Sequence, residues 1–107
     1  MENQAIIDEL YFCAAQCTRC YDACLIEKDK GRLEQCISFD LDCADICRLT
    51  GQLFERGSKN AELFLKLCSE ICDKCAEECE KHDHDHCREC AIMCRKCAEE
   101  CMSMTAA

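Results

Sequence analysis

The sequence predicts an all-α protein, an antiparallel up-down-up-down four-helix bundle with a cysteine-lined core. Two observations carry this prediction. Cysteine and apolar residues recur at alternating steps of three and four, which return an α-helix to the same face. The chain also has no proline and three glycines in 107 residues, so turn residues are scarce. This length suits one domain, residues 1–107, that is large enough to bury a core.

The first helix is expected from about residue 4 to residue 28, with Asn3 as a candidate N-cap. One stripe of this helix faces the core: Ile6, Leu10, Cys13, Cys17, Cys20 and Cys24. A second stripe runs along another side: Ile7, Tyr11, Ala14, Thr18, Tyr21 and Leu25. Two stripes need two packing partners, so this helix either has a wide core face or contacts another copy of the chain.

A turn at residues 28–31 leads to the second helix, which ends near Gly57, with Ser58 or Asn60 as the next N-cap. Its inward stripe is Leu33, Cys36, Asp40, Cys43, Cys47, Thr50 and Phe54. Asp40 therefore occupies a core position. An unpaired buried carboxylate is costly. Asp40 needs a metal ion or a hydrogen-bond donor, unless it lies at the edge of the stripe and reaches water.

The third helix is expected at about residues 60–81 and the fourth from the following turn to about Met104, with Asp83 or Asp85 as its cap. The third helix carries Cys68, Cys72, Cys75 and Cys79. The fourth carries Cys87, Cys90, Cys94, Cys97 and Cys101. The turn between them, residues 81–86, contains all three histidines of the chain. Similar helix lengths and short turns are typical of an up-down bundle.

Antiparallel threading makes the bundle different at its two ends. Most thiols collect toward the end that holds the turns at residues 28–31 and 81–86. The opposite end is apolar and collects Ile6, Leu10, Phe54, Phe64, Leu65 and Met104. The sequence therefore predicts an apolar plug, then a tube of thiols, then the histidines.

Composition excludes several classes of protein. The net charge of −9 argues against nucleic acid as a partner and attracts cations. No run approaches the roughly 18 apolar residues of a membrane span. The first residues lack the positive segment of a signal peptide, so we expect a cytoplasmic protein whose thiols stay reduced. Cysteines three or four apart on one helix also stand too far apart for a disulfide.

A core of sulfur indicates soft-metal binding, because thiolates select Cu(I), Zn(II) or iron–sulfur clusters. Ferredoxin-type cluster motifs use irregular loops that often end in Cys-Pro, and this chain has no proline. Each Cu(I) can displace one thiol proton and leave the core neutral, whereas a divalent ion balances at half that loading. The pattern therefore favours a store of monovalent soft ions. The sequence contains no separate catalytic Cys–His–acid set and no nucleotide-binding glycine loop, so we expect the protein to have no enzymatic activity.

The cysteine pairs and the histidine-containing turn are similar to those of a known protein family. Inward C-x3-C pairs on four helices, together with the turn from Lys81 to Cys87, make the chain similar to the cytosolic copper storage proteins. The resemblance implies a bundle that binds many Cu(I) ions, assembles into a homotetramer and opens at its histidine end. By position, the pairs that match are Cys13/Cys17, Cys20/Cys24, Cys43/Cys47, Cys68/Cys72, Cys75/Cys79, Cys90/Cys94 and Cys97/Cys101.

Other ligands are expected around these pairs. Cys36 and Cys87 lack a cysteine four residues away, so they must share ions across helices, and Asp40 is a candidate substitute beside Cys36. His82 is expected as the first histidine ligand, since it extends the stripe three residues beyond Cys79. His86 comes next, and His84 is left open.

Two other functions compete with Cu(I) storage. One is a zinc or cadmium buffer of the metallothionein type, because four stripes can assemble tetrahedral sulfur sites. The other is a redox protein that uses iron–sulfur clusters or dithiols. A copper chaperone is a candidate partner for the storage function.

Overall fold

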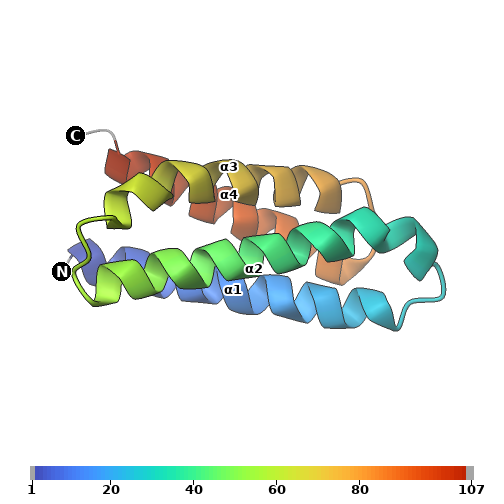
Figure 1. Cartoon of the computed structure of the whole chain (residues 1–107). Coiled ribbons are helices and arrows are strands. Elements are labelled where there is room, and N and C mark those ends of the chain that lie inside the picture. Colours follow the sequence, from blue (N-terminus) through green and yellow to red (C-terminus); the bar gives the residue numbers. More distant parts are fainter. Residues whose placement is uncertain (1, 106–107) are drawn as a thin grey trace.

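A computed structural model describes residues 2–105, which form a bundle of four antiparallel α-helices (Figure 1). The helices are α1 (Glu2–Leu25), α2 (Glu34–Glu55), α3 (Ala61–Cys79) and α4 (Asp85–Thr105), with a short 3-10 helix, η1 (Lys30–Leu33), before α2. The molecule measures 43 × 21 × 19 Å along its principal axes. The all-α prediction is confirmed. None of the helices within residues 2–105 is both long and apolar enough to span a membrane.

The predicted inward stripes form the core of this bundle. On α1, the side chains of Leu10, Cys13 and Cys17 are fully buried. On α2, Leu33 enters the core from the end of η1 and Phe54 closes the same face at the other end of the helix. Steps of three and four therefore keep one side of every helix on the bundle axis, as the sequence predicted.

The beginning of α1 differs from the prediction. The helix starts at Glu2, so Asn3 lies inside it and is not the N-cap. The other end of α1 is also earlier than expected, at Leu25. The predicted turn at residues 28–31 contains the first half of η1, whose backbone continues almost directly into α2.

The connection from α2 to α3 confirms the predicted glycine stop. Gly57 has a φ of 65°, the left-handed conformation that glycine adopts without strain. Its N–H donates to the carbonyl of Phe54 at 3.1 Å, and the N–H of Ser58 donates to that of Leu53 at 2.9 Å. This is the Schellman pattern of helix termination. Asn60 then holds the N-cap position of α3 without a capping side-chain hydrogen bond.

The start of α4 corrects a second cap. The backbone carbonyl of His84 accepts hydrogen bonds from the N–H groups of Cys87 and Arg88. His84 therefore occupies the N-cap position, and Asp85 is the first residue of the helix. Neither Asp83 nor Asp85 caps the helix as predicted. Asp85 still places a negative charge at the positive end of the helix dipole, where it is favourable.

The second stripe of α1 packs mainly against α2. Ile7 and Ala14 are buried, and the ring of Tyr11 lies over Gly51 of α2. A Cβ atom at Gly51 would stand 2.8 Å from Cε1 of Tyr11, so the missing side chain lets the two helices approach. Thr18 and Leu25, farther along this stripe, are exposed. The wide core face within one bundle therefore accounts for Ile7, Tyr11 and Ala14, the first half of the stripe.

The two ends of the bundle differ as predicted. Phe54, Leu65 and Met104 line one hollow beside the α2–α3 connection. Figure 1 shows this connection at the end where α1 begins. At the opposite end, His84 and His86 contact acidic residues of the α1–α2 connection. The apolar plug and the histidines thus lie about the length of the bundle apart.

Candidate metal centre

The core of the bundle is lined by thiols. The 16 cysteine side chains all have zero exposure, and none of them forms a disulfide within residues 2–105. Four come from α1, three from α2, four from α3 and five from α4: Cys13, Cys17, Cys20, Cys24, Cys36, Cys43, Cys47, Cys68, Cys72, Cys75, Cys79, Cys87, Cys90, Cys94, Cys97 and Cys101. The structure places every predicted thiol ligand on the axis.

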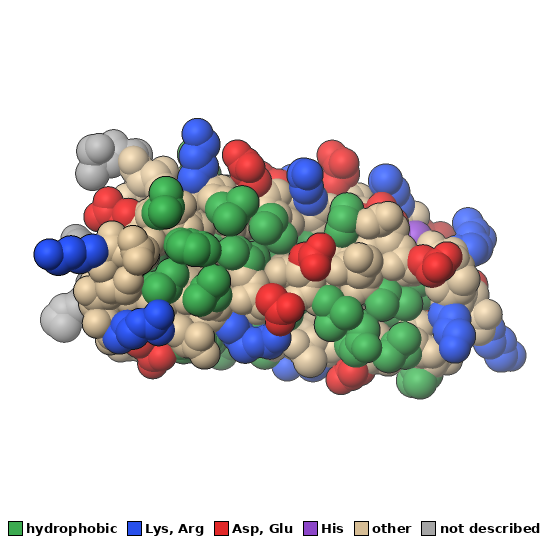
Figure 2. Space-filling view, in the orientation of Figure 1, with side chains coloured by type: hydrophobic (Ala, Val, Ile, Leu, Met, Phe, Trp, Pro, Cys, Tyr) green, Lys and Arg blue, Asp and Glu red, His purple; other side chains and the backbone are tan. Residues whose placement is uncertain are grey.

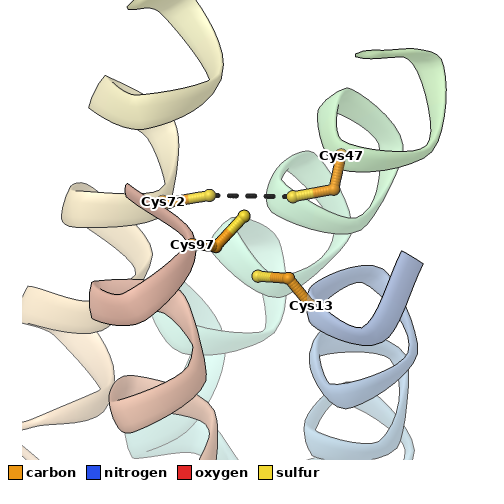
Figure 3. A group of neighbouring side chains, drawn as sticks. All are labelled: Cys13, Cys47, Cys72 and Cys97. Carbon is orange, nitrogen blue, oxygen red and sulfur yellow. Dashed lines mark hydrogen bonds between the residues drawn. The ribbon is translucent and has the colours of Figure 1, made fainter. Parts of the chain in front are cut away.

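A cross-section near the middle of the bundle shows how the helices combine. Cys13, Cys47, Cys72 and Cys97 each come from a different helix, and their sulfur atoms point toward one another (Figure 3). The four sulfur atoms lie within 4.8 Å of one another, and the Sγ atoms of Cys47 and Cys72 are 3.6 Å apart. A group of this size can surround a thiolate-bound metal ion.

Similar groups follow one another toward the histidine end, and neighbouring groups share members. They are Cys13–Cys17–Cys43–Cys94, then Cys17–Cys75–Cys90–Cys94, then Cys20–Asp40–Cys79–Cys90. Shared sulfur atoms make the sites a continuous ladder rather than separate pockets. A thiolate that belongs to two groups can bridge two ions.

Sulfur atoms approach more closely between helices than along them. Pairs four residues apart on one helix have Sγ–Sγ distances of 3.9 Å for Cys20/Cys24 and 4.0 Å for Cys43/Cys47. Between helices, the distance falls to 3.5 Å for Cys17–Cys94 and 3.4 Å for Cys36–Cys79. The last pair agrees with the expectation that Cys36 shares its ligands across helices. The group Cys13–Cys17–Cys43–Cys94 contains a pair on one helix, whereas Cys13–Cys47–Cys72–Cys97 contains only pairs between helices.

Asp40 contributes a carboxylate to one of these groups, together with Cys20, Cys79 and Cys90. Its side chain has zero exposure, so the alternative of an edge position in water is wrong. Its Oδ1 accepts hydrogen bonds from the thiols of Cys75 at 3.3 Å and Cys90 at 3.4 Å. Burial of the carboxyl group, the largest cause, raises the pKa of Asp40 to about 10. The carboxyl group therefore holds a proton at neutral pH.

The histidine end closes with a mixed group of Cys20, Cys24, Cys87 and His86. The Nδ1 atom of His86 lies 3.6 Å from the sulfur of Cys20, 3.8 Å from that of Cys24 and 3.6 Å from that of Cys87. The imidazole is 18% exposed, so it stands between the thiols and solvent. Burial raises the pKa of the Cys24 thiol to about 12, which keeps this group protonated until an ion displaces the proton.

His82 and His84 lie differently from His86. The Nε2 atom of His82 is 3.0 Å from Oε2 of Glu78, and Nε2 of His84 is 3.0 Å from Oδ1 of Asp29. The rings of His84 and His86 stack with centroids 5.2 Å apart. The structure thus brings His86 to the thiols and holds His82 against an acid. Since α3 ends at Cys79, the helical step that favoured His82 does not continue to that residue.

Sequence reasoning missed an acidic residue at this end. Glu27 contacts both His86 and His84 through its Oε2 atom, at 2.9 Å and 3.3 Å. The signal was present, because Glu27 follows Cys24 by three residues and so continues the inward stripe of α1.

Comparison with known proteins identifies similar chains. Residues 1–106 match the profile of the copper storage protein family. A cysteine-rich protein of Bacillus subtilis, YhjQ, whose function is uncharacterised, is 41% identical over 97% of this chain and 96% of its own. The match covers nearly the full length of both chains, so the similarity extends over the whole bundle.

Solved structures give the same picture. Cu(I)-bound BsCsp3, a Bacillus subtilis copper storage protein, superposes with a TM-score of 0.95 at 40% identity, over 99% of this chain and 100% of that one. The Streptomyces lividans protein Ccsp, loaded with 10 copper equivalents, gives a TM-score of 0.94 at 37% identity, over 98% of this chain and 84% of that one. A cytosolic copper storage protein from Streptomyces lividans, in a structure with five coppers, gives a TM-score of 0.93 at 36% identity, over 99% of this chain and 96% of that one.

Proposed function

This chain belongs to the copper storage protein family, and from that premise we propose that its sulfur-lined core takes up Cu(I) as cargo and so stores or detoxifies copper in the cytoplasm. The observation that carries the proposal is the ladder of groups of four ligand atoms, which runs along the bundle axis with shared sulfur atoms. A single structural metal site needs one such group. A ladder suits a cargo of many ions.

Charge balance favours Cu(I) over a divalent ion. Bare thiolates cannot accumulate in a dry core because each unpaired buried charge is costly. An incoming Cu(I) replaces one thiol proton, so the core stays neutral at one ion per cysteine. Zn(II) or Cd(II) would reach the same balance at about half that loading. Iron–sulfur clusters would add inorganic sulfide, for which a core of close-packed thiols leaves little room.

We propose as ligands the 16 cysteines with Asp40 and His86. His82 remains a predicted ligand at the outer rim, where its ring is held by Glu78. Copper carries the chemistry of this protein as bound cargo, and no step of catalysis is assigned to any residue. We also propose that the whole chain acts as a single copper-binding domain.

The histidine end is proposed as the opening for ions. The group of Cys20, Cys24, Cys87 and His86 has an imidazole at the surface, and neutral imidazole is an acceptable but weaker ligand for Cu(I) than thiolate. At the other end the core is closed by buried Leu10 and Leu65, with Phe54 beside them. Hydrocarbon side chains offer an ion no ligand. Ions can therefore step inward from imidazole to sulfur.

Assembly into a homotetramer is a further part of the proposal. Apolar side chains stay exposed in the single chain, among them Ile92 at 71%, Leu63 at 73% and Phe12 at 63%. Figure 2 shows apolar side chains gathered in patches on the face formed by α2 and α3. Patches of this kind mark contact surfaces in soluble proteins. A copper chaperone is proposed as the partner that delivers the ions. Nucleic acid is not proposed as a partner, because the net charge of −9 would repel it.

An anaerobic Cu(I) titration of the reduced protein against a chromophoric chelator tests the function, with Zn(II) as the comparison. We expect Cu(I) loading to approach the 16 cysteines within a few ions and to exceed Zn(II) loading about twofold. Saturation at one or two Cu(I), or equal loading by both metals, would contradict storage. A brown colour after purification would support an iron–sulfur protein instead.

A further inference from the structure

Glu27 lies just after the end of α1, where the chain turns toward η1, and it faces the histidines of the α3–α4 connection. Its Oε2 atom is 2.9 Å from Nε2 of His86 and 3.3 Å from Nδ1 of His84. The side chain is 30% exposed. One carboxylate therefore contacts both rings of the stacked pair at the opening.

The contact between Glu27 and His86 determines which nitrogen of His86 carries the proton. An ionised carboxylate only accepts hydrogen bonds, so Nε2 of His86 must donate. In the neutral ring the other nitrogen, Nδ1, then keeps its lone pair. Nδ1 is the atom that faces the sulfur atoms of Cys20, Cys24 and Cys87. The lone pair is thus directed into the group of thiols.

The other two histidines have acidic partners as well, but a different orientation. His84 contacts Asp29 through Nε2 and Glu27 through Nδ1, so acids face both of its nitrogens. His82 contacts Glu78, four residues before it in the chain. Among the described side chains, His86 combines a carboxylate on one nitrogen with thiols on the other. This arrangement has the form of the carboxylate–histidine–metal triads in which an outer carboxylate orients the ligand.

We infer that Glu27 is a positioning residue, which holds His86 in the tautomer and orientation that presents Nδ1 to a Cu(I) ion at the opening of the thiol ladder. This inference rests on the proposed function, because it assigns a role toward the same cargo. Glu27 itself does not contact the ion. It acts through the ring of His86 and raises the affinity of the outermost site.

Glu27→Ala tests this role, with Asp29→Ala as the matched control. Asp29→Ala removes a carboxylate of the same charge at the same end, but that carboxylate is bonded to His84. Both positions lie outside the helices and are partly exposed, so both variants should fold, which circular dichroism checks. Glu27→Gln is the conservative variant, since its amide oxygen still accepts a hydrogen bond from Nε2.

The first measurement needs no metal. Nitrogen-15 NMR of the imidazole groups in the reduced, metal-free protein reports which nitrogen of His86 is protonated. We expect the Nε2–H tautomer in the parent protein, in Asp29→Ala and in Glu27→Gln, and a mixture of tautomers in Glu27→Ala. A single unchanged tautomer in Glu27→Ala would overturn the inference.

The second measurement is chelator competition for the most weakly held Cu(I) ion. We expect Glu27→Ala to weaken its binding about tenfold, the scale at which outer carboxylates act on metal affinity. Glu27→Gln should lose less, Asp29→Ala should lose little, and Glu27→Ala should have no further effect in a His86→Ala background. Equal losses in Glu27→Ala and Asp29→Ala, or an undiminished loss without His86, would show a general charge effect and refute positioning.

The two arms separate the inference from the proposed function. If the parent protein takes up no Cu(I), the storage function fails, whatever the NMR spectra show. If the parent loads many ions and Glu27→Ala behaves like the parent in both measurements, storage stands and the role of Glu27 is refuted.

Discussion

The two ends of this bundle use the same helical positions for different purposes. At the end where α1 begins, the inward positions hold leucine and phenylalanine, such as Leu10, Leu65 and Phe54. At the histidine end, equivalent positions hold cysteine, as at Cys20 and Cys79, and these are equally buried. Burial alone does not distinguish a folding core from a ligand set. What distinguishes them is whether the buried atoms can bind an ion.

The difference indicates how the molecule can be stable before it is loaded. A leucine side chain buries several apolar groups, each worth about 0.8 kcal/mol, whereas a cysteine packs as a small hydrophobe. The apolar end therefore contributes more to the free energy of unfolding per residue, and the thiol end contributes the proposed ligands for Cu(I). The predictions that follow test this division, from the largest expected effect on the free energy of unfolding to the smallest.

Leu65→Ala should have the largest effect. Leu65 is fully buried in α3, and removal of a leucine side chain from a packed core costs about 2–5 kcal/mol. Urea denaturation of the reduced, metal-free protein measures this loss. Cys79→Ala removes a single sulfur atom from an equally buried site at the histidine end of the same helix and should cost clearly less. If the two variants lost equal stability, the proposed division between the ends would be wrong.

Asp40→Asn should change how stability depends on pH. Because the pKa of Asp40 is about 10 in the folded chain and near 4 when unfolded, the folded state keeps a proton that the unfolded state releases in between. Stability therefore falls as pH rises above about 4, by at most about 1.4 kcal/mol per pH unit from this group. Asn does not titrate, so the variant should show a flatter profile between pH 5 and pH 7.

Denaturation of both proteins at several pH values, without metal, gives the two slopes. Equal slopes would mean that Asp40 is already ionised in the folded state. The same variant is expected to alter the binding of one or two Cu(I) ions at most, since Asp40 belongs to one part of the ladder. A loss of most of the ions would contradict that expectation.

Gly51→Ala should have a smaller effect, confined to the contact of α1 with α2. The new Cβ would stand 2.8 Å from the ring of Tyr11, whose hydroxyl group is held by Glu55. Crowding of this kind costs about 1–3 kcal/mol, while replacement of a helical glycine returns up to about 1 kcal/mol. We expect a net loss of about 1 kcal/mol. In a Tyr11→Ala background the crowding is absent, so Gly51→Ala should increase the free energy of unfolding. A decrease in that background would show that the strain does not come from the ring of Tyr11.

Replacement of His82, His84 and His86 by alanine should have the least effect on stability and on the final Cu(I) count. The rings are partly exposed, so little packing is lost. Stopped-flow measurements should instead show slower uptake and slower removal by a chelator. If the triple variant loads at the parental rate, while a polar substitution at Phe54 speeds loading, ions enter through the apolar end.

The sequence predicted most of the core because helical periodicity is a strong local signal. It placed Cys36 and Asp40 on one inward face, and both are fully buried. It also predicted which end holds the histidines, since antiparallel threading follows from four helices with short connections. The burial of Asp40 was left open, because periodicity fixes the face of a helix but not how deep its edge lies.

Connections and helix ends were harder to predict. Asn3 has the chemistry of a cap, yet α1 already begins at Glu2. The ordering of His82 before His86 assumed that α3 continues, whereas the helix ends at Cys79 and the chain changes direction. The pairing of His86 with Glu27 joins residues 59 positions apart. Such a contact depends on how two connections meet in space, which local patterns do not encode.

The closed apolar end has a consequence for the order in which copper leaves. When ions can enter and leave a core at one end only, the last ions to bind are the first to be released. With the proposed opening at the histidine end, ions bound near Cys13, Cys47 and Cys97 would lie behind those near Cys20, Cys24 and His86, and would leave only after the outer ions. The outer ions then behave as a small exchangeable fraction, and the inner ions as a reserve that responds only to prolonged demand.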